Sequence, residues 1–314
     1  MKLALAIQEY VEHKRSLGML FTSSTVRLKA FLKQLGDVEL ESITPEQVTV
    51  YLNGTPGPVT SFWFAKHTAL NGFFQYGINC CYLERSPLPS VLPQPLAKFL
   101  PYIYSVADMR RLLEAADSRH RFVWLLEPHT VRCLLLLLYG TGVRIGEATR
   151  LTISDVDFHN RTLMVRGTKF FKTRMVPFGS DLARVLGDYY ASQWADKSPK
   201  PDSRFLCTRT GNSITIQTAE LVFYRLRAEA GISRSDGARY QPRLHDFRHT
   251  FAVTRLVTWY REGKNVQRLL PHLSTYMGHV RIADTARYLT LTKELLQGAS
   301  RCFELYAMPE VSHD

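Results

Sequence analysis

The feature that most constrains the fold of this chain is a run of prolines near its first third. Five prolines fall within residues 86–101. Proline lacks a backbone N–H and has a fixed φ, so the run excludes a continuous helix and a central strand. It is typical of an extended, fairly stiff linker. Because 314 residues suffice for two domains, we expect an N-terminal domain over residues 1–86, a linker over residues 87–102 and a second domain over residues 103–314.

The first domain has the pattern of a compact helical unit. Apolar residues at helical spacing predict four helices, over residues 3–17, 26–35, 43–53 and 59–79, the second with an N-cap among residues 22–25. Thr44 is a plausible N-cap of the third, with Pro45 at its first position. The fourth is rich in aromatic residues, which we interpret as core rather than as a platform for stacking bases. The sequence therefore predicts a four-helix domain.

The second domain mixes helices with a few short strands. Helices are predicted at residues 106–117, capped by Ser105, at 128–139, shortly after 141, and from 180 onward. Strands are predicted at residues 153–158, 162–166 and 174–178. The expected fold class is therefore mainly α, with a small antiparallel β-sheet in the second domain.

Charge and cysteine content narrow the partners and the compartment. The net charge is +12, of which residues 1–90 carry +1 and residues 91–314 carry +11. A basic domain favours a polyanion such as nucleic acid, although excess charge can also serve solubility alone. The cysteines number five with no CxxC spacing, which argues against a disulfide framework or a structural zinc site. Without a signal peptide pattern or a membrane-spanning run, we expect a cytoplasmic protein with no membrane role.

Two clusters in the basic domain could contact a phosphate. In Thr141–Glu147 (TGVRIGE), Arg144 lies at a glycine-flanked turn, where its guanidinium could donate two parallel bonds to a phosphate. Glu147 could face the same way and orient that group. In Lys169–Arg174 (KFFKTR), a predicted hairpin tip could deliver a lysine as a general acid. Taken singly, these residues are better explained as an exposed ion pair at a helix start and a solvated basic turn.

Two further clusters follow in the C-terminal third. In Leu244–Thr250 (LHDFRHT), His245 and Arg248 share a helix face and could meet one phosphate. Asp246 and His249 are expected to face elsewhere and serve structure. His279 in MGH is followed nine residues later by Tyr288. A tyrosine in a helix is by default a core-edge residue, but a phenolate near cations can act as a nucleophile.

Taken in order, these clusters resemble one family. The succession of Arg in TGVRIGE, Lys in a hairpin, HxxR in HDFRHTF, GH, and Tyr nine residues later is similar to that of the tyrosine recombinases, the phage integrase family with its Xer-type and Cre-type enzymes. The resemblance is specific over about residues 141–290. It implies an N-terminal core-binding (DNA-binding) domain, a linker and a catalytic domain.

The resemblance also implies a role for each matched residue. Arg144 and Arg248 would clamp the scissile phosphate, and His245 and His279 would bond to it or assist proton transfer. Tyr288 would attack phosphorus and form a 3′-phosphotyrosyl bond. The remaining matches are Lys169, which would protonate the 5′ leaving oxygen, Lys172 as the alternative hairpin lysine, and Glu147 at a supporting acidic position.

The implied chemistry needs neither metal nor cofactor. No carboxylate cluster of the kind that holds catalytic metals and no P-loop motif occurs in the sequence. Cationic and imidazole groups could neutralise the transition state instead. A phosphotyrosyl link retains the bond energy, so a 5′-hydroxyl could reverse the step without ATP.

The expected partner is double-stranded DNA carrying specific recombination sites, bound by a homotetramer or by a tetramer shared with related recombinases. Integration or excision of a mobile element is the expected role, in the cytoplasm at the nucleoid. Residues 291–314 form an amphipathic segment that could dock on a neighbouring protomer or on its own domain. A type IB topoisomerase-like enzyme, a DNA-binding protein without catalysis and a chance motif in a basic helical protein remain alternatives.

Overall fold

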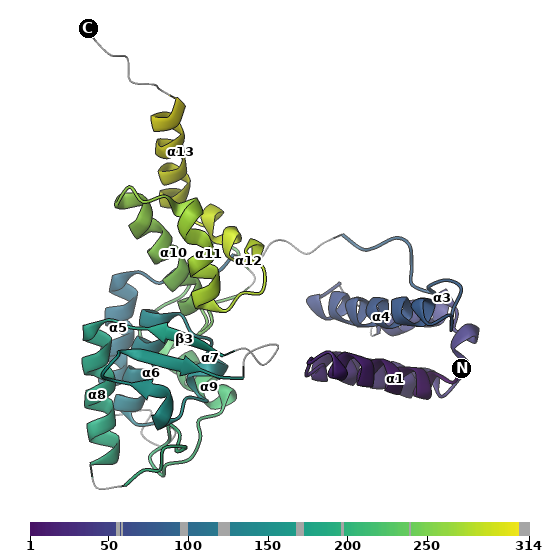
Figure 1. Ribbon diagram of the computed structural model, residues 1–314, viewed down its shortest axis with the longest axis horizontal. Helices are drawn as coiled ribbons and strands as arrows, with labels where there is room; N and C mark the ends of the chain where they lie inside the picture. The colour runs from purple at the N-terminus through teal and green to yellow at the C-terminus, as the bar shows by residue number, and fades with distance from the viewer. Residues whose placement is uncertain are drawn as a thin grey trace. The chain divides into compact units, whose positions relative to one another are not determined.

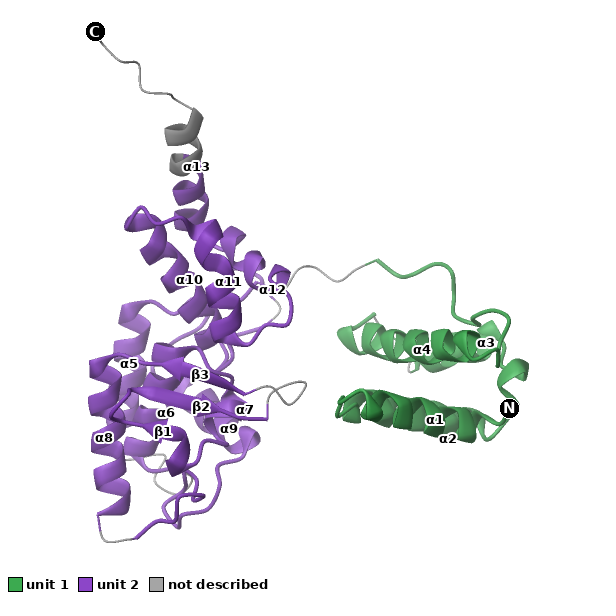
Figure 2. Ribbon diagram, viewed as in Figure 1, with its two compact units in different colours: residues 1–98, 169–171 green, residues 99–168, 172–314 purple. Residues whose placement is uncertain are grey.

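The computed structural model describes residues 1–54, 57, 59–94, 100–118, 126–167, 173–195, 198–238 and 240–307, with side chains as far as Ser300. The chain divides into two compact units, residues 1–98 and most of residues 99–314 (Figure 2). Both are built mainly from helices, and a three-stranded antiparallel sheet lies in the second. The predicted fold class, mainly α with a small antiparallel sheet, is confirmed.

The first unit is a four-helix domain with an aromatic core. Its elements are α1 (Leu3–Ser16), α2 (Thr22–Leu35), the 3-10 turn η1 (Leu40–Ser42), α3 (Pro45–Asn53) and α4 (Ser61–Asn79). Phe31, Phe73 and Phe74 are almost fully buried where these helices pack. The prediction that the aromatics of α4 are core fails for Phe62, which is 56% exposed. Phe62 lies in the first turn of α4, where the Lys66 ammonium sits 5.2 Å from its ring.

Helix α3 begins as its sequence predicts. The backbone N–H of Gln47 donates to Thr44 Oγ1 (3.4 Å), and the N–H of Thr44 donates to Gln47 Oε1 (2.9 Å). This reciprocal capping box satisfies two N–H groups that a helix start leaves unpaired. Pro45 occupies the first helical position, where its missing N–H costs nothing.

The proline-rich stretch has no regular structure where it is described. Residues 86–94 and 100–105 contain neither helix nor strand. Backbone hydrogen bonds that a helix or sheet would need are unavailable at each proline. The stretch ends at Ser105, which caps the next helix by accepting a bond from the N–H of Asp108 (3.0 Å).

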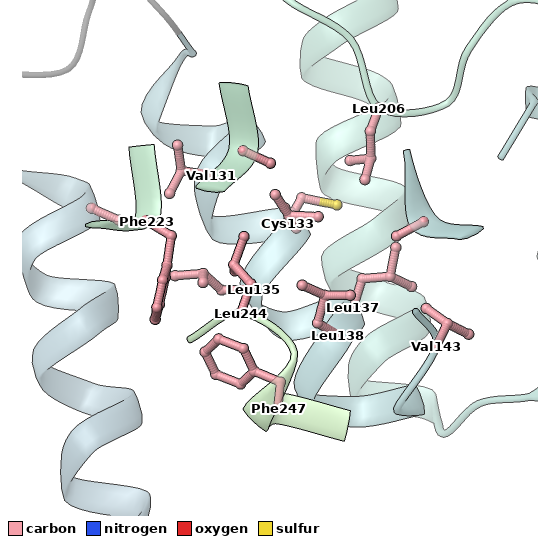
Figure 3. Packing of buried hydrophobic residues seen from close by; sticks show 14 of the residues in the cluster. Val131, Cys133, Leu135, Leu137, Leu138, Val143, Leu206, Phe223, Leu244 and Phe247 are labelled. Atoms are coloured by element: carbon pink, nitrogen blue, oxygen red, sulfur yellow. The ribbon is translucent and has the colours of Figure 1, made fainter. Parts of the chain in front are cut away.

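The second unit is built around the apolar helix α6 (Pro128–Thr141), which contacts α5 (Val106–Asp117) and α8 (Ser180–Trp194). These helices are labelled in Figure 1. The elements of this unit in order are α5 (Val106–Asp117), α6 (Pro128–Thr141), α7 (Ile145–Ala148), the 3-10 turn η2 (Ile153–Asp155), β1 (Val156–Asp157), β2 (Thr162–Val165), β3 (Arg174–Pro177), α8 (Ser180–Trp194) and α9 (Ile216–Glu229). Leu135 and Leu138 of α6 lie in one buried cluster with Phe223 of α9 and with Phe247 (Figure 3). Helix α6 is buried on most sides, so it anchors the loop that follows it.

The sheet has the order β1-β2-β3, with Leu163 paired to Val176 across the second pair of strands. The strand predicted over residues 153–158 is mostly wrong: residues 153–155 form η2, and only Val156 and Asp157 pair. The reason is a local cap, because Asp155 accepts bonds from the N–H (3.0 Å) and the hydroxyl (2.8 Å) of Thr152. That cap favours a helical turn over an extended strand.

The C-terminal helices form a second apolar cluster of this unit. They are α10 (Asp246–Arg261), α11 (Val266–Met277), α12 (Ala283–Ala286), the 3-10 turn η4 (Arg287–Thr290) and α13 (Lys293–Ala307). The long stretch between HDFRHTF and MGH is thus divided between α10 and α11 by a turn. Leu295, in the first turn of α13, is fully buried in a cluster with Leu256 of α10. None of the described helices is both long and apolar enough to cross a membrane.

Candidate active site

Five of the residues predicted from the motifs come together in the second unit, all at the ends of short or long helices. Arg144 precedes α7, His245 and Arg248 lie at the start of α10, His279 follows α11, and Tyr288 lies in η4. The hairpin lysines, Lys169 and Lys172, lie outside the described residues. The described part of the site therefore consists of arginine, histidine and tyrosine side chains with Glu147.

The turn after α6 aims Arg144. Gly142 ends α6 with a φ of +62°, in the left-handed region that favours glycine. A Cβ at this position would lie 2.6 Å from a ring atom of Phe251, so a side chain does not fit. The Gly142 carbonyl accepts a bond from Arg248 Nη1 (2.8 Å). One glycine thus connects the end of α6, the start of α10 and the backbone that carries Arg144.

Glu147 joins two arginines that come from different elements. Arg144 Nη1 donates to Glu147 Oε1 (2.8 Å), and Arg174 of β3 donates to both carboxylate oxygens (3.1 and 2.8 Å). The backbone N–H of Arg144 also donates to Glu147 (2.9 Å). We call Arg144, Glu147, Arg174 and Arg248 the arginine cluster. Its carboxylate is held on all sides, which fixes where Arg144 can point.

Glu147 is ionised near neutral pH. Burial alone would raise the pKa of this carboxyl, but the hydrogen bonds and charge of Arg174, together with Arg144, outweigh burial and lower the pKa to about 2. The side chain of Glu147 is 4% exposed. A buried carboxylate of this kind orients its neighbours rather than exchanging protons near neutral pH.

Arg248 is the most deeply buried cation of the cluster, at 2% exposure. Its Nη1 donates to the Gly142 carbonyl and its Nη2 donates to the Met277 carbonyl. Burial, and then the charge of Arg144, lower the pKa of its guanidinium to about 9. It still carries its charge at neutral pH, so two positive groups lie close together here.

The turn after α11 is held by the same arginines. Gly278 has a φ of +66°, and a Cβ there would lie 3.0 Å from the Arg174 guanidinium. Arg144 Nη2 donates to the Gly278 carbonyl (3.2 Å), and Arg174 Nε donates to the Tyr276 carbonyl (2.8 Å). The backbone just before His279 is therefore positioned by the arginine cluster.

His279 is oriented by a buried hydroxyl. Its Nδ1 lies 2.6 Å from Thr285 Oγ1, and Thr285 is fully buried at the end of α12. Burial, followed by the charges of Arg248 and Arg144, lowers the pKa of His279 to about 4. The imidazole is neutral near pH 7, and its Nδ1 contact fixes the ring so that Nε2 is the atom left for a ligand.

Tyr288 is buried beside two imidazoles. The residue is 2% exposed, and its Oη lies 3.1 Å from His249 Nδ1. The rings of His279 and Tyr288 stack with centroids 6.2 Å apart. Burial raises the pKa of the phenol, and the charge of Arg248 opposes that rise. We call His249, His279, Thr285 and Tyr288 the tyrosine cluster; it holds the phenol in its protonated form.

His245 completes the group at the start of α10. Although the residue is exposed, the protein atoms packed around its ring and the charge of Arg248 lower its pKa to about 4. Its ring centroid lies 5.0 Å from that of His249. His245 is therefore neutral near pH 7 and accessible to a ligand.

Sequence reasoning missed two members of the site. His249 was expected to face away from it, and this is wrong, since His249 contacts the hydroxyl of Tyr288. Arg174 was not expected to take part. The alternation of β3 could have revealed it: Arg174 and buried Val176 share one face of the strand, and an inward arginine requires an acid. The position of His249 beside Tyr288 had no comparable local signal, because 39 residues separate the two.

The donor set suits a tetrahedral anion. Arginine forks and neutral imidazoles with a free N–H pair well with phosphate oxygens. Within the described residues, no group of three or more histidine, cysteine or carboxylate side chains gathers where it could hold a metal ion. The chemistry available from these residues is anion binding with a phenol close by.

Comparisons with known proteins agree with this geometry. The sequence profile of the Phage integrase family matches residues 105–294. The chain is 36% identical over 302 residues to y4rB of Sinorhizobium fredii, which is named as an integrase/recombinase, with 95% of this chain and 96% of that protein covered. It is 27% identical over 285 residues to the tyrosine recombinase XerC of Lacticaseibacillus casei, covering 87% of this chain and 91% of that protein.

Solved structures show the same fold. The Tn1549 transposon integrase, in complex with a circular intermediate DNA, aligns with a TM-score of 0.69 and 18% identity over 96% of this chain and 99% of that one. A lambda integrase dimer bound to a core site aligns with a TM-score of 0.62 and 18% identity over 90% and 96%. The family match covers more than half of the chain, and the relatives cover nearly all of it. The chain therefore belongs to the phage integrase family, the tyrosine recombinases that cleave and rejoin DNA.

Proposed function

We propose that the chain is a site-specific DNA recombinase whose nucleophile is Tyr288. Tyr288 Oη attacks a scissile phosphodiester, a 3′-phosphotyrosyl bond forms, and the 5′-hydroxyl leaves. The observation that carries this proposal is the burial of the phenol beside two neutral imidazoles and close to Arg248. A core-edge tyrosine would need none of these neighbours.

The arginine cluster supplies the charge that the transition state needs. Negative charge gathers on the non-bridging oxygens during attack, and donors fixed in advance stabilise it without rearrangement. Arg144 and Arg248 clamp these oxygens, and His245 and His279 donate hydrogen bonds to the same phosphate. Glu147 and Arg174 hold Arg144 and the turn before His279 in place. We assign no metal and no nucleotide cofactor to the reaction.

The hairpin lysine protonates the leaving 5′-oxygen. Lys169 is our first choice for this general acid, and Lys172 is the alternative. An ammonium near an alkoxide leaving group removes the need for a strongly basic product. A Lys169→Ala variant should be rescued by a substrate with sulfur at the 5′ bridging position, because a thiolate leaves without a proton.

The full reaction joins strands from two DNA sites held by a homotetramer or by a tetramer shared with related recombinases. The domain of residues 1–86 and the catalytic domain of residues 103–314 both contact the duplex, and the linker of residues 87–102 connects them. The start of α13 packs on α10 of the same chain through Leu295, so exchange between protomers would fall to residues after Ser300. The role is integration or excision of a mobile element at the nucleoid.

One experiment tests the proposal. Fragments of the genome that carries the gene are incubated with the protein in EDTA, and SDS-stable protein–DNA complexes are recovered and sequenced. The recovered sites are then built as nicked duplexes, which trap the covalent intermediate because the leaving strand diffuses away. The wild-type chain should form an adduct, and Tyr288→Phe should form none.

The matched control is Tyr276→Phe, which removes a hydroxyl that donates to the Pro177 carbonyl (3.2 Å) outside the tyrosine cluster. It should leave adduct formation within a few-fold of wild type. Strand exchange between two recovered sites separates a recombinase from an enzyme that only nicks and reseals. Absence of any adduct, with DNA binding retained, would indicate a DNA-binding protein without catalysis.

A further inference from the structure

The proposed reaction gives no role to one hydrogen-bond contact of the Tyr288 hydroxyl. His249 Nδ1 lies 3.1 Å from Tyr288 Oη, within hydrogen-bond reach. The two rings are tilted by 56° with centroids 5.5 Å apart. Both residues are shielded from solvent, Tyr288 almost completely. His249 Nδ1 is thus a hydrogen-bond partner of the attacking oxygen.

We infer that His249 is a further catalytic residue, whose Nδ1 accepts the phenolic proton of Tyr288 as Oη bonds to phosphorus. This inference rests on the proposed function, because it assigns a role within the same reaction. It requires the tautomer that carries its proton on Nε2, so that the phenol donates and Nδ1 accepts.

The fold places His249 rigidly for this role. It lies in the first turns of α10, directly after Arg248, whose two nitrogens are fixed to the carbonyls of Gly142 and Met277. Tyr288 comes from η4, which packs on α10. A base carried by a long, anchored helix keeps its distance to the nucleophile better than one on a loop.

The other histidines are less suited to take this proton. His279 Nδ1 is held by Thr285 Oγ1 at 2.6 Å, and its ring stacks on that of Tyr288 instead of pointing a nitrogen at the hydroxyl. His245 contacts His249 edge to face, with its centroid 5.0 Å away. Each of the three imidazoles therefore has a distinct position. Of these three, His249 is the one that forms a hydrogen-bond contact with Tyr288 Oη.

The charges around His249 make its basicity depend on the substrate. Burial, then neighbouring positive charge, lowers its pKa to about 3 in the DNA-free chain. The groups that face it are Arg243, His245, Arg248, Arg287 and the Tyr288 phenol. A phosphate anion bound by the arginines would offset their repulsion and raise the pKa of His249. The imidazole would become a stronger base only when a target is present.

The proton balance of the step closes without a co-reactant. The Oη–phosphorus bond forms, the bond from phosphorus to the 5′-oxygen breaks, and the phenolic proton passes to His249 Nδ1. A separate proton from the hairpin lysine goes to the 5′-oxygen. In the rejoining step, the 5′-hydroxyl attacks phosphorus and returns its proton to the hairpin lysine, while His249 returns its proton to the departing Tyr288 oxygen.

The test compares His249→Asn, which keeps an acceptor near the Nδ1 position but cannot take a proton, with His249→Phe, which has no acceptor. Single-turnover adduct formation on a nicked duplex is measured for both. We expect each to lose about 10²-fold in rate at pH 7, the usual contribution of a general base. Thermal melting and DNA-binding affinity should match wild type for at least the asparagine variant.

The pH dependence separates proton transfer from a packing role. In both variants the rate should rise about tenfold per pH unit up to the pKa of the phenol, because only ionised Tyr288 can then attack. The wild-type rate should be nearly flat over the same range. Sulfur at the 5′ bridging position should not rescue either variant, because it replaces the acid and not the base.

The matched control is His129→Phe. It removes another partly buried histidine, whose Nε2 lies 3.0 Å from Gln193 Oε1. Its cleavage rate should equal that of wild type. Wild-type activity in His249→Asn, or losses that are the same at every pH, would overturn the inference and leave His249 a structural residue. A wild-type chain that forms no adduct would overturn the proposed function instead, so the two failures are distinguishable.

Discussion

The arginine cluster and the tyrosine cluster lie side by side but are stabilised in opposite ways. In the arginine cluster, Glu147 bridges Arg144 and Arg174, and the ionised form of the carboxyl is favoured: the pKa of Glu147 is lowered to about 2. In the tyrosine cluster, burial favours the neutral forms: it raises the pKa of Tyr288 and lowers the pKa of His279 to about 4. One half is charged before any ligand arrives, and the other is held uncharged.

This difference indicates how Tyr288 can remain unreactive until a target phosphate is bound. The arginines are fixed in advance by carbonyls and by Glu147, so they cost little reorganisation when a phosphate binds. The tyrosine lies on η4, next to α12, and both are only four residues long. Its phenol stays protonated until charge from a bound phosphate changes the balance at His249.

Removing a charged donor should cost the most. Arg144→Ala should lower the rate of adduct formation by about 10³-fold, because one fixed donor to a developing oxyanion has this weight. DNA binding should change far less, since many phosphate contacts share it. The measurement is single-turnover cleavage of a nicked duplex.

The control for this variant is Arg132→Ala. Arg132 lies on α6 and pairs with Asp117 at 3.0 Å on the surface, with 43% of its side chain exposed. Exposed pairs contribute little, so this variant should cleave at the wild-type rate. Equal losses in the two variants would mean that general positive charge, rather than the arginine cluster, supports cleavage.

Loss of the bridging carboxylate should weaken both arginines. Glu147→Gln keeps the shape but leaves Arg144 and Arg174 without their counter-charge, and breaking a buried pair costs about 3–5 kcal/mol. Urea unfolding at pH 7 should show this loss, together with a lower cleavage rate. Because the folded pKa is about 2 and the usual value 4.5, the stabilisation is complete above pH 4.5 and declines on acidification toward 2. The wild-type and Gln variants should therefore converge at low pH; a constant difference would contradict the assignment.

The turn before His279 offers a smaller and cleaner test. Gly278 and Gly263 both have a φ of +66°, but a Cβ at Gly278 would meet the Arg174 guanidinium at 3.0 Å, whereas Gly263 has no atom within 4 Å. Gly263→Ala should cost about 1–2 kcal/mol from backbone strain alone. Gly278→Ala should cost more and should also slow cleavage by shifting Arg174. Identical effects of the two substitutions would show that Arg174 does not position this turn.

The smallest effect concerns the histidines of the DNA-free chain. His245, His249 and His279 have pKa values lowered to about 4, 3 and 4, so their imidazole NMR signals should not titrate between pH 7 and 6. The unfolded chain takes up protons near pH 6.5, so the stability should fall as the pH is lowered from 6.5 toward 4. Titration of the His249 and His279 signals near pH 6.5 would contradict the neutral character of the tyrosine cluster, and titration of the His245 signal there would contradict its lowered pKa.

Local chemistry explains which parts of this molecule could be predicted. Helix starts were predicted well where one residue sets them, as at Thr44 with Gln47 and at Ser105 with Asp108. The strand over residues 153–158 was predicted from apolar content, whereas the Thr152–Asp155 cap determines the turn. Short polar caps outweigh apolar patterning when the segment has only a few residues.

The site was predictable where its residues follow a motif. Arg144, His245, Arg248, His279 and Tyr288 were all selected because their order resembles that of the tyrosine recombinases, and the structure places them together. His249 was not, because its partner is brought near by the packing of η4 on α10, which spacing along one helix does not reveal. Arg174 was overlooked because its acid, Glu147, lies on a different element.

The role of Tyr288 as the nucleophile is tested most directly by identifying the bond between protein and DNA. The adduct trapped on a nicked duplex is digested with protease and nuclease, and the modified peptide is sequenced by mass spectrometry. We predict a nucleotide attached through its 3′-phosphate to Tyr288. Attachment to any other residue, or through a 5′-phosphate, would contradict it.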